Sequence, residues 1–271
     1  MKKYFFILVV SFISCNGNKE ETEKEPDILI QSEPAEKKAK EDSLINQIKK
    51  FPDSALNKEN LIQFYRDNNE LKKALAETQK RIDSDSTNAR WWKIKATLHY
   101  ENGDTIASIK AFEKAISIYP ATNDIVSLGL IYAQTANKRA LEVAEYILSS
   151  QYINYEKDAW YIKGLYYTYT NKKPEAIKMY DKVIGLSYTY MDAYREKAIA
   201  LYDLKKYKEA TDVLIKATTV QNSFDEGYFY LGKCYEKLNK PKDAIEAYQK
   251  ALLYAPDFKE AEEAVNRLSG N

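Results

Sequence analysis

The chain has little of the chemistry on which most enzymes depend. Its 271 residues include one histidine, His99, and two cysteines, Cys15 and Cys234. One histidine cannot build a histidine-rich metal site, and no cysteine pair has the short spacing of a zinc site. The eight glycines form neither a Gly-x-x-x-x-Gly-Lys phosphate loop nor a Gly-x-Ser-x-Gly nucleophile elbow. We therefore expect a protein that is not an enzyme and that needs no metal or cofactor.

An excess of charge of one sign is also missing. The chain has 41 Lys and Arg against 40 Asp and Glu, a formal net charge of +1. A nucleic-acid-binding protein would show a basic excess or stripe, so we exclude that class. Cys234 stands among apolar positions of a predicted helix, where a lone cysteine behaves as a small buried apolar residue. His99 occupies a position held by Tyr or Leu in comparable segments, which predicts a packed side chain and not a catalytic one.

What the chain has in quantity is a repeated pattern. From Asp225 onward, Tyr228, Leu231, Gly232 and Tyr235 have the i, i+3, i+4, i+7 spacing of one helical face. A second apolar set and a proline follow. The same spacing recurs at a constant interval along the chain, with weaker matches toward the N-terminus. The second set comprises Ala244, Tyr248, Ala251 and Pro256.

A period of about 34 residues with this pattern resembles the tetratricopeptide repeat (TPR). The resemblance implies an all-α fold, a right-handed α-solenoid of about six helix pairs that bury their apolar faces by stacking. A capping helix and tail at 259–271 would close it, and a leading helix at 42–54 would precede it. The predicted pairs occupy residues 55–88, 89–122, 123–156, 157–190, 191–224 and 225–258.

The pair at 123–156 departs from the regular pattern. Leu128-Gly129-x-x-Tyr132 is clear, but the closing proline is missing and surplus residues follow at 151–155. Because each repeat fixes the angle of its successor, we expect a net insertion here to form a hinge between 55–122 and 157–258.

The first fifteen residues differ from everything after them. Met1-Lys2-Lys3 is positively charged, and residues 4–13 are apolar, as in a signal peptide. Ser14-Cys15 resembles the lipobox of bacterial lipoproteins, although Phe12 stands where leucine is usual. We therefore predict a signal peptide at 1–14 and lipid attachment at Cys15. The alternative is ordinary secretory cleavage with an incidental cysteine.

Residues 15–41 are predicted to be a disordered tether, because their charge-rich composition buries little apolar surface. We interpret this charge run as a solvated spacer. The alternative is a surface-export signal, because its acidic residues resemble those of Bacteroidota lipoproteins. We predict an outer-membrane lipoprotein of a bacterial cell envelope. Which face of the membrane it occupies stays open.

In TPR proteins, the first helix of each pair lines a concave groove. The resemblance places an aromatic and mildly basic set there, and such exposed sets commonly mark interaction sites. The carboxylate clamp of chaperone-binding TPR domains is not matched, since Thr97 stands where asparagine is required after Lys93. The predicted groove residues are Lys93, Tyr100, Tyr161, Leu165, Tyr169, Arg195, Ile199, Tyr202, Phe229 and Lys233.

Three functions remain open at this point. The first is a lipid-anchored adaptor that holds a protein or peptide partner in the groove. The second is a structural subunit docked into an envelope complex through its convex face or its ends, and the third is a glycan-binding lipoprotein. TPR surfaces diverge while the core persists, so the residues alone do not choose among them.

Overall fold

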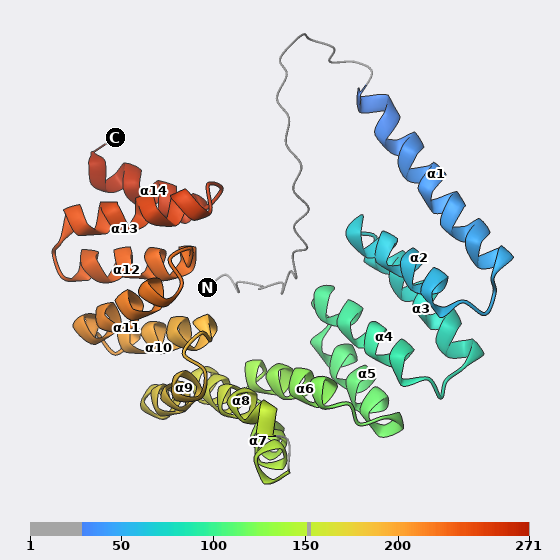
Figure 1. The fold of residues 1–271 in the computed structure, drawn as a ribbon, viewed down its shortest axis with the longest axis horizontal. Coiled ribbons are helices and arrows are strands. Elements are labelled where there is room, and N and C mark those ends of the chain that lie inside the picture. The colour runs from blue at the N-terminus through green and yellow to red at the C-terminus, as the bar shows by residue number, and fades with distance from the viewer. Residues whose placement is uncertain (1–28, 151–152, 271) are drawn as a thin grey trace. The chain divides into compact units, whose positions relative to one another are not determined.

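The computed structural model describes residues 29–150 and 153–270, and within these ranges it contains α-helices, one short 3-10 turn and no strand (Figure 1). The predicted all-α repeat fold is confirmed. The chain divides into two compact units, Met1–Pro120 and Ala121–Asn271. The predicted signal peptide and Cys15 lie outside the described residues.

The first unit contains a long helix followed by two helix pairs. The helices are α1 (Leu29–Lys50), α2 (Ala55–Asp67), α3 (Leu71–Ser84), α4 (Ala89–Glu101) and α5 (Thr105–Ile118).

The second unit contains four pairs and a final single helix. Its helices are α6 (Thr122–Gln134), α7 (Arg139–Ser149), α8 (Glu156–Tyr169), α9 (Lys173–Leu186), α10 (Met191–Asp203), α11 (Tyr207–Val220), α12 (Asp225–Lys237), α13 (Pro241–Tyr254) and α14 (Lys259–Ser269), with the 3-10 turn at Ile153–Tyr155.

Helix α1 differs from the sequence prediction because it begins at Leu29, so that residues 29–41 of the predicted disordered tether are helical. Their Glu, Lys and Ala content favours a helix. The segment also has partners that its composition does not reveal. The Lys37 ammonium donates to Glu70 at 2.9 Å, and the Tyr65 hydroxyl donates to Glu41 at 2.8 Å. Further along α1, Leu44, Ile45 and Ile48 pack against the core of α2 and α3, as expected of a leading helix.

The first helix of every pair ends in the same way. A residue with positive φ follows it, and the next backbone N–H donates to a carbonyl of the last helical turn, for example Lys240 N to Tyr235 O at 3.0 Å. This left-handed ending satisfies carbonyl groups that the helix leaves unpaired. The positive-φ residues are Asn69, Gly103, Ala136, Asn171, Lys205 and Asn239.

These turns also correct the expected insertion in the third pair. Gly103 and Asn171 stand two full repeat periods apart, and Ala136 lies one position short of the midpoint between them. The irregular pair therefore moves its turn by one position and contains no net insertion between the flanking turns. The hinge stays a prediction, and the boundary between the two compact units falls at Pro120/Ala121, just before this pair.

Within two pairs of the second unit, a glycine lies under a tyrosine ring. A methyl group on Gly232 would stand 2.7 Å from the ring of Tyr248, and one on Gly164 would stand 2.5 Å from that of Tyr180. Both tyrosines are almost fully buried, and each hydroxyl is bound on the first helix. The first helix therefore requires glycine at this position when the second helix places a tyrosine ring against it. The pair α10–α11 uses Ala198 and Leu214 instead, both buried.

Candidate functional site on the first helices

The predicted groove residues fall into two separate groups. Lys93 and Tyr100 lie on α4 in the first unit, where Lys93 is exposed and Tyr100 is half-buried. The remaining residues lie on the first helices α8, α10 and α12 of the second unit. The second group comes from three successive first helices, and we call its accessible side chains, Tyr169, Ile199, Tyr202 and Lys233, the first-helix surface.

Tyr161 and Leu165 on α8 are part of the core and not of an open groove. They are 7% and 5% exposed. The ring of Tyr190, from the turn before α10, lies 5.0 Å from that of Tyr161, and Tyr180 lies 5.8 Å from it. Burial raises the pKa of Tyr161 well above its ordinary value. The prediction that these two side chains contact a partner is corrected, because Tyr190 covers the position that Tyr161 would offer.

Arg195 on α10 is the centre of an ionic cluster. Its guanidinium lies 2.8 Å from Asp192, 3.2 Å from Glu196 and 2.6 Å from Glu226 on α12, and its side chain is 11% exposed. Burial, opposed by Arg195, raises the pKa of both Glu196 and Glu226. Arg195 is thus held by its own chain and joins α10 to α12. Sequence reasoning missed the two glutamates, although Glu226 belongs to a recurrent acidic position near the start of the first helices, with Asp158, Asp192 and Glu260.

Lys233 on α12 lies among aromatic rings. Its ammonium is 5.3 Å from the ring centre of Tyr202, 5.6 Å from that of Phe229 and 5.1 Å from that of Tyr230. Such contacts are attractive because the ring face is electron-rich. The structure therefore brings together Tyr202, Phe229 and Lys233 as the sequence predicted, and adds Tyr230, which the sequence reasoning did not select.

Phe229 has a second role at this site. Its ring lies 4.7 Å from that of Phe258 and 5.6 Å from that of Tyr248, so it also packs the last pair against the turn before α14. The side chains left accessible are Tyr169, which is 54% exposed, and the half-buried Ile199, Tyr202 and Lys233. A surface of this kind offers apolar area, aromatic faces and one cation, which suits recognition of a polypeptide.

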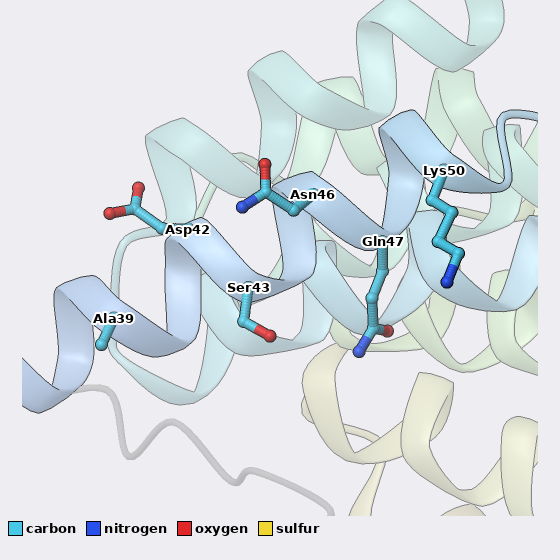
Figure 2. A pocket seen from close by; sticks show the side chains of 6 residues that line it. All are labelled: Ala39, Asp42, Ser43, Asn46, Gln47 and Lys50. Carbon is cyan, nitrogen blue, oxygen red and sulfur yellow. The ribbon is translucent and has the colours of Figure 1, made fainter.

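The remaining features of the described chain offer no second site. Six polar or small side chains, Ala39, Asp42, Ser43, Asn46, Gln47 and Lys50, line a shallow depression, but all come from the exposed face of α1 alone (Figure 2). In residues 29–150 and 153–270, no group of His, Cys, Asp and Glu side chains could hold a metal ion. Over the same residues no helix has the length and apolar character to cross a membrane.

Cys234 and His99, whose side chains are the most reactive in the described part of the chain, are both packed. Cys234 is 1% exposed, and burial raises the pKa of its thiol to about 11, so that it is protonated at neutral pH. His99 is 18% exposed and lies 3.7 Å from Asp104, while burial lowers its pKa. Neither side chain is activated for catalysis.

Stacked helix pairs with a repeated first-helix surface define the chain as an α-helical repeat protein. Protein-family models agree on the kind of repeat. Residues 225–258 match one tetratricopeptide-repeat model, and residues 94–122 and 157–190 match another. The chain therefore contains tetratricopeptide repeats, as the resemblance implied.

Solved structures share the fold at low sequence identity. A tetratricopeptide repeat protein from Parabacteroides merdae is 19% identical, with a TM-score of 0.67, and the match covers 90% of this chain and 96% of that one. PilW, a type IV pilus biogenesis factor, is 16% identical with a TM-score of 0.62, over 77% of this chain and 96% of that one. Yeast Tom70 is 16% identical with a TM-score of 0.63, and the match covers 79% of this chain and 46% of that one. No curated protein matches the sequence significantly.

Proposed function

We propose that this protein is a lipid-anchored adaptor of a bacterial cell envelope that binds a protein partner on the first-helix surface of its second unit. The TPR repeats indicate a protein–protein interaction scaffold. The observation that carries the finer proposal is the accessible set of Tyr169, Ile199, Tyr202 and Lys233 on neighbouring first helices. Its partner is a polypeptide and not a nucleic acid, the chain is not an enzyme, and no cofactor is involved.

Lipid anchoring is supported by the sequence alone. The apolar run at 4–13 ends in Ser14-Cys15, and multiple acyl chains on one cysteine would anchor the protein durably. Cys15→Ala should release the protein from membranes or leave its signal peptide uncleaved. A wild-type protein that is processed normally and is found in the soluble fraction would refute the anchor.

The partner-binding surface is tested separately from the anchor. A crosslinkable residue in place of Tyr169 or Tyr202 should give discrete adducts in membranes. The variant Tyr169→Ala/Tyr202→Ala/Lys233→Ala should lose these partners while keeping its helical content. Tyr161 is left unchanged because its loss would damage the core.

A structural subunit is the second candidate, and one observation favours it. Ile215 on α11 and Leu253 on α13 are 44% and 70% exposed, although both lie on second helices, away from the first-helix surface. If Ile215→Glu/Leu253→Glu abolishes partner recovery and the triple variant does not, this candidate replaces the adaptor.

A further inference from the structure

The two edges of the second unit at which its helices turn carry charge of opposite sign. Consecutive helices are antiparallel, as α12, α13 and α14 show, so the turns alternate between the two edges (Figure 1). The turns inside the regular pairs form the lysine edge, and the turns between pairs, with the start of α8, form the acidic edge. The lysine edge is defined by Lys172, Lys173, Lys205, Lys206, Lys237 and Lys240, and the acidic edge by Asp158, Asp192, Asp225, Glu226, Asp257 and Glu260.

Contacts between pairs support this division. Lys173, the first residue of α9, lies 2.9 Å from Asp203 at the end of α10, so turns of successive pairs are neighbours along the lysine edge. Arg267 near the end of α14 lies 2.8 Å from Glu236 near the end of α12. The lysines therefore form a row and are not scattered points.

Part of the charge on each edge is neutralised locally. On the lysine edge, Lys206 lies 3.0 Å from Glu209, and on the acidic edge Arg195 binds Asp192 and Glu226. Lys172, Lys205 and Lys237 are exposed, and within the described residues no ion pair involves them. The same holds for Asp257 and Glu260 on the acidic edge. An excess of opposite sign therefore remains on each edge.

Helix dipoles do not account for the asymmetry. A helix N-terminus favours acidic side chains, and a C-terminus favours basic ones. Each edge contains both kinds of terminus, because one helix ends and the next begins at every turn. The dipole effect is thus the same on both edges, and the opposite charges need another explanation.

Exposed apolar side chains accompany the charges. On the acidic edge, Leu186, Val220 and Tyr254 are 50%, 36% and 41% exposed and follow each other at the interval of the repeat. On the lysine edge, Tyr169 and Leu204 are 54% and 38% exposed. Apolar area flanked by charge matches the apolar centre and polar rim of a protein contact.

We propose that the second unit binds a second copy of this chain edge to edge, with the lysine edge of one copy against the acidic edge of the next. Both edges repeat once per helix pair, so their charges have the same spacing and several pairs engage together. The formal net charge of +1 opposes such an approach very little. A contact between two different surfaces is heterologous and extends into a row of molecules. Only Tyr169 is shared with the first-helix surface, so Ile199, Tyr202 and Lys233 stay available, and the association does not depend on the proposed adaptor function.

The proposal is tested with the full chain, kept in one mild detergent throughout, by sedimentation velocity at increasing protein concentration. At 50 mM NaCl the wild type should associate, and at 500 mM NaCl the association should weaken by at least about tenfold, because salt screens the exposed charges. Lys172→Glu/Lys205→Glu/Lys237→Glu makes both edges acidic, and Asp225→Lys/Asp257→Lys/Glu260→Lys makes both basic. Each variant alone should sediment as a monomer.

An equimolar mixture of the two variants should recover association, because an acidic edge then meets a basic edge again. This recovery also shows that both variants are folded. The control, Lys178→Glu/Lys182→Glu/Lys216→Glu, makes the same charge change on the second helices and should associate like the wild type. A wild type that stays monomeric, a mixture that stays monomeric, or a control that loses association equally would overturn the proposal. So would a monomeric wild type that binds vesicles containing phosphatidylglycerol through the same lysines, because the lysine edge would then serve an anionic membrane.

Discussion

The pairs at 157–190 and 225–258 are built from the same glycine and tyrosine contact but use the surface of their first helix differently. In the former, Tyr161 and Leu165 are buried, and the ring of Tyr190 lies against that of Tyr161. In the latter, the corresponding residues are Phe229 and Lys233, which stay half-exposed among rings. The difference shows that a repeat position does not determine exposure. The turn that follows each pair supplies an aromatic ring, Tyr190 against Tyr161 and Phe258 against Phe229, and yet only Tyr161 is buried, so this covering ring by itself does not decide exposure.

The largest loss of stability should come from removing the buried ring of Tyr161. Tyr161→Ala removes a buried ring and should lower the free energy of unfolding by about 3–5 kcal/mol. Tyr169→Ala, at a side chain 54% exposed on the same helix, should cost less than about 1 kcal/mol. Urea denaturation followed by circular dichroism measures both. Similar losses for the two variants would contradict the distinction between a closed and an open position.

The next effect concerns the ion cluster that joins the two first helices. Arg195→Met keeps much of the packed stem but leaves Glu196 and Glu226 without their cation. Removing one partner of a buried charge cluster should cost about 3 kcal/mol. Hydrogen exchange should show the loss in α10 and α12, with α6 much less affected, because each repeat touches mainly its neighbours. An equal loss across the whole second unit would contradict this local picture.

A smaller loss of stability should follow from adding a methyl group at Gly232, beneath the ring of Tyr248. Gly232→Ala places a methyl group 2.7 Å from the Tyr248 ring and should cost about 1–3 kcal/mol. Gly185→Ala is the matched control, because Gly185 lies in a helix with nothing within 4 Å of the added methyl group. That change should stabilise the protein by about 0.4–1 kcal/mol. Thermal unfolding of the two variants should shift in opposite directions.

The smallest effect is a difference in the pH dependence of stability between Glu196 on α10 and Glu236 near the end of α12. The hydrogen bond from Arg267 lowers the pKa of Glu236 below 4.5, so its stabilising contribution is present above that pH and is lost as the pH falls through the lowered value. Burial raises the pKa of Glu196 in the folded protein, so stability rises as the pH falls through the raised value toward 4.5. Glu196→Gln should reduce this gain above pH 4.5, and Glu236→Gln should reduce the loss below pH 4.5. Melting temperatures across this range would show either effect, and identical profiles for the two variants would contradict the assignment.

The helix pairs could be predicted from the sequence because they depend on local spacing. The i, i+3, i+4, i+7 sets, the small residues such as Gly232 and Ala244, and the residues after each first helix recur at a fixed period. The site was predicted less well. Lys233 was placed correctly beside Tyr202 and Phe229, whereas Tyr161 and Leu165 were assigned to a groove in which they are not exposed.

The sequence alone determined the all-α class and the period of the repeat, since helical periodicity acts over a few neighbouring residues. Only the tertiary structure decided that residues 29–41 are helical, that Arg195 is neutralised within the chain, and that Tyr190 covers Tyr161. Each of these depends on side chains of different helices or turns. Such contacts are set by how the pairs stack, and the apolar spacing within one helix does not say which side chains of neighbouring elements will reach it.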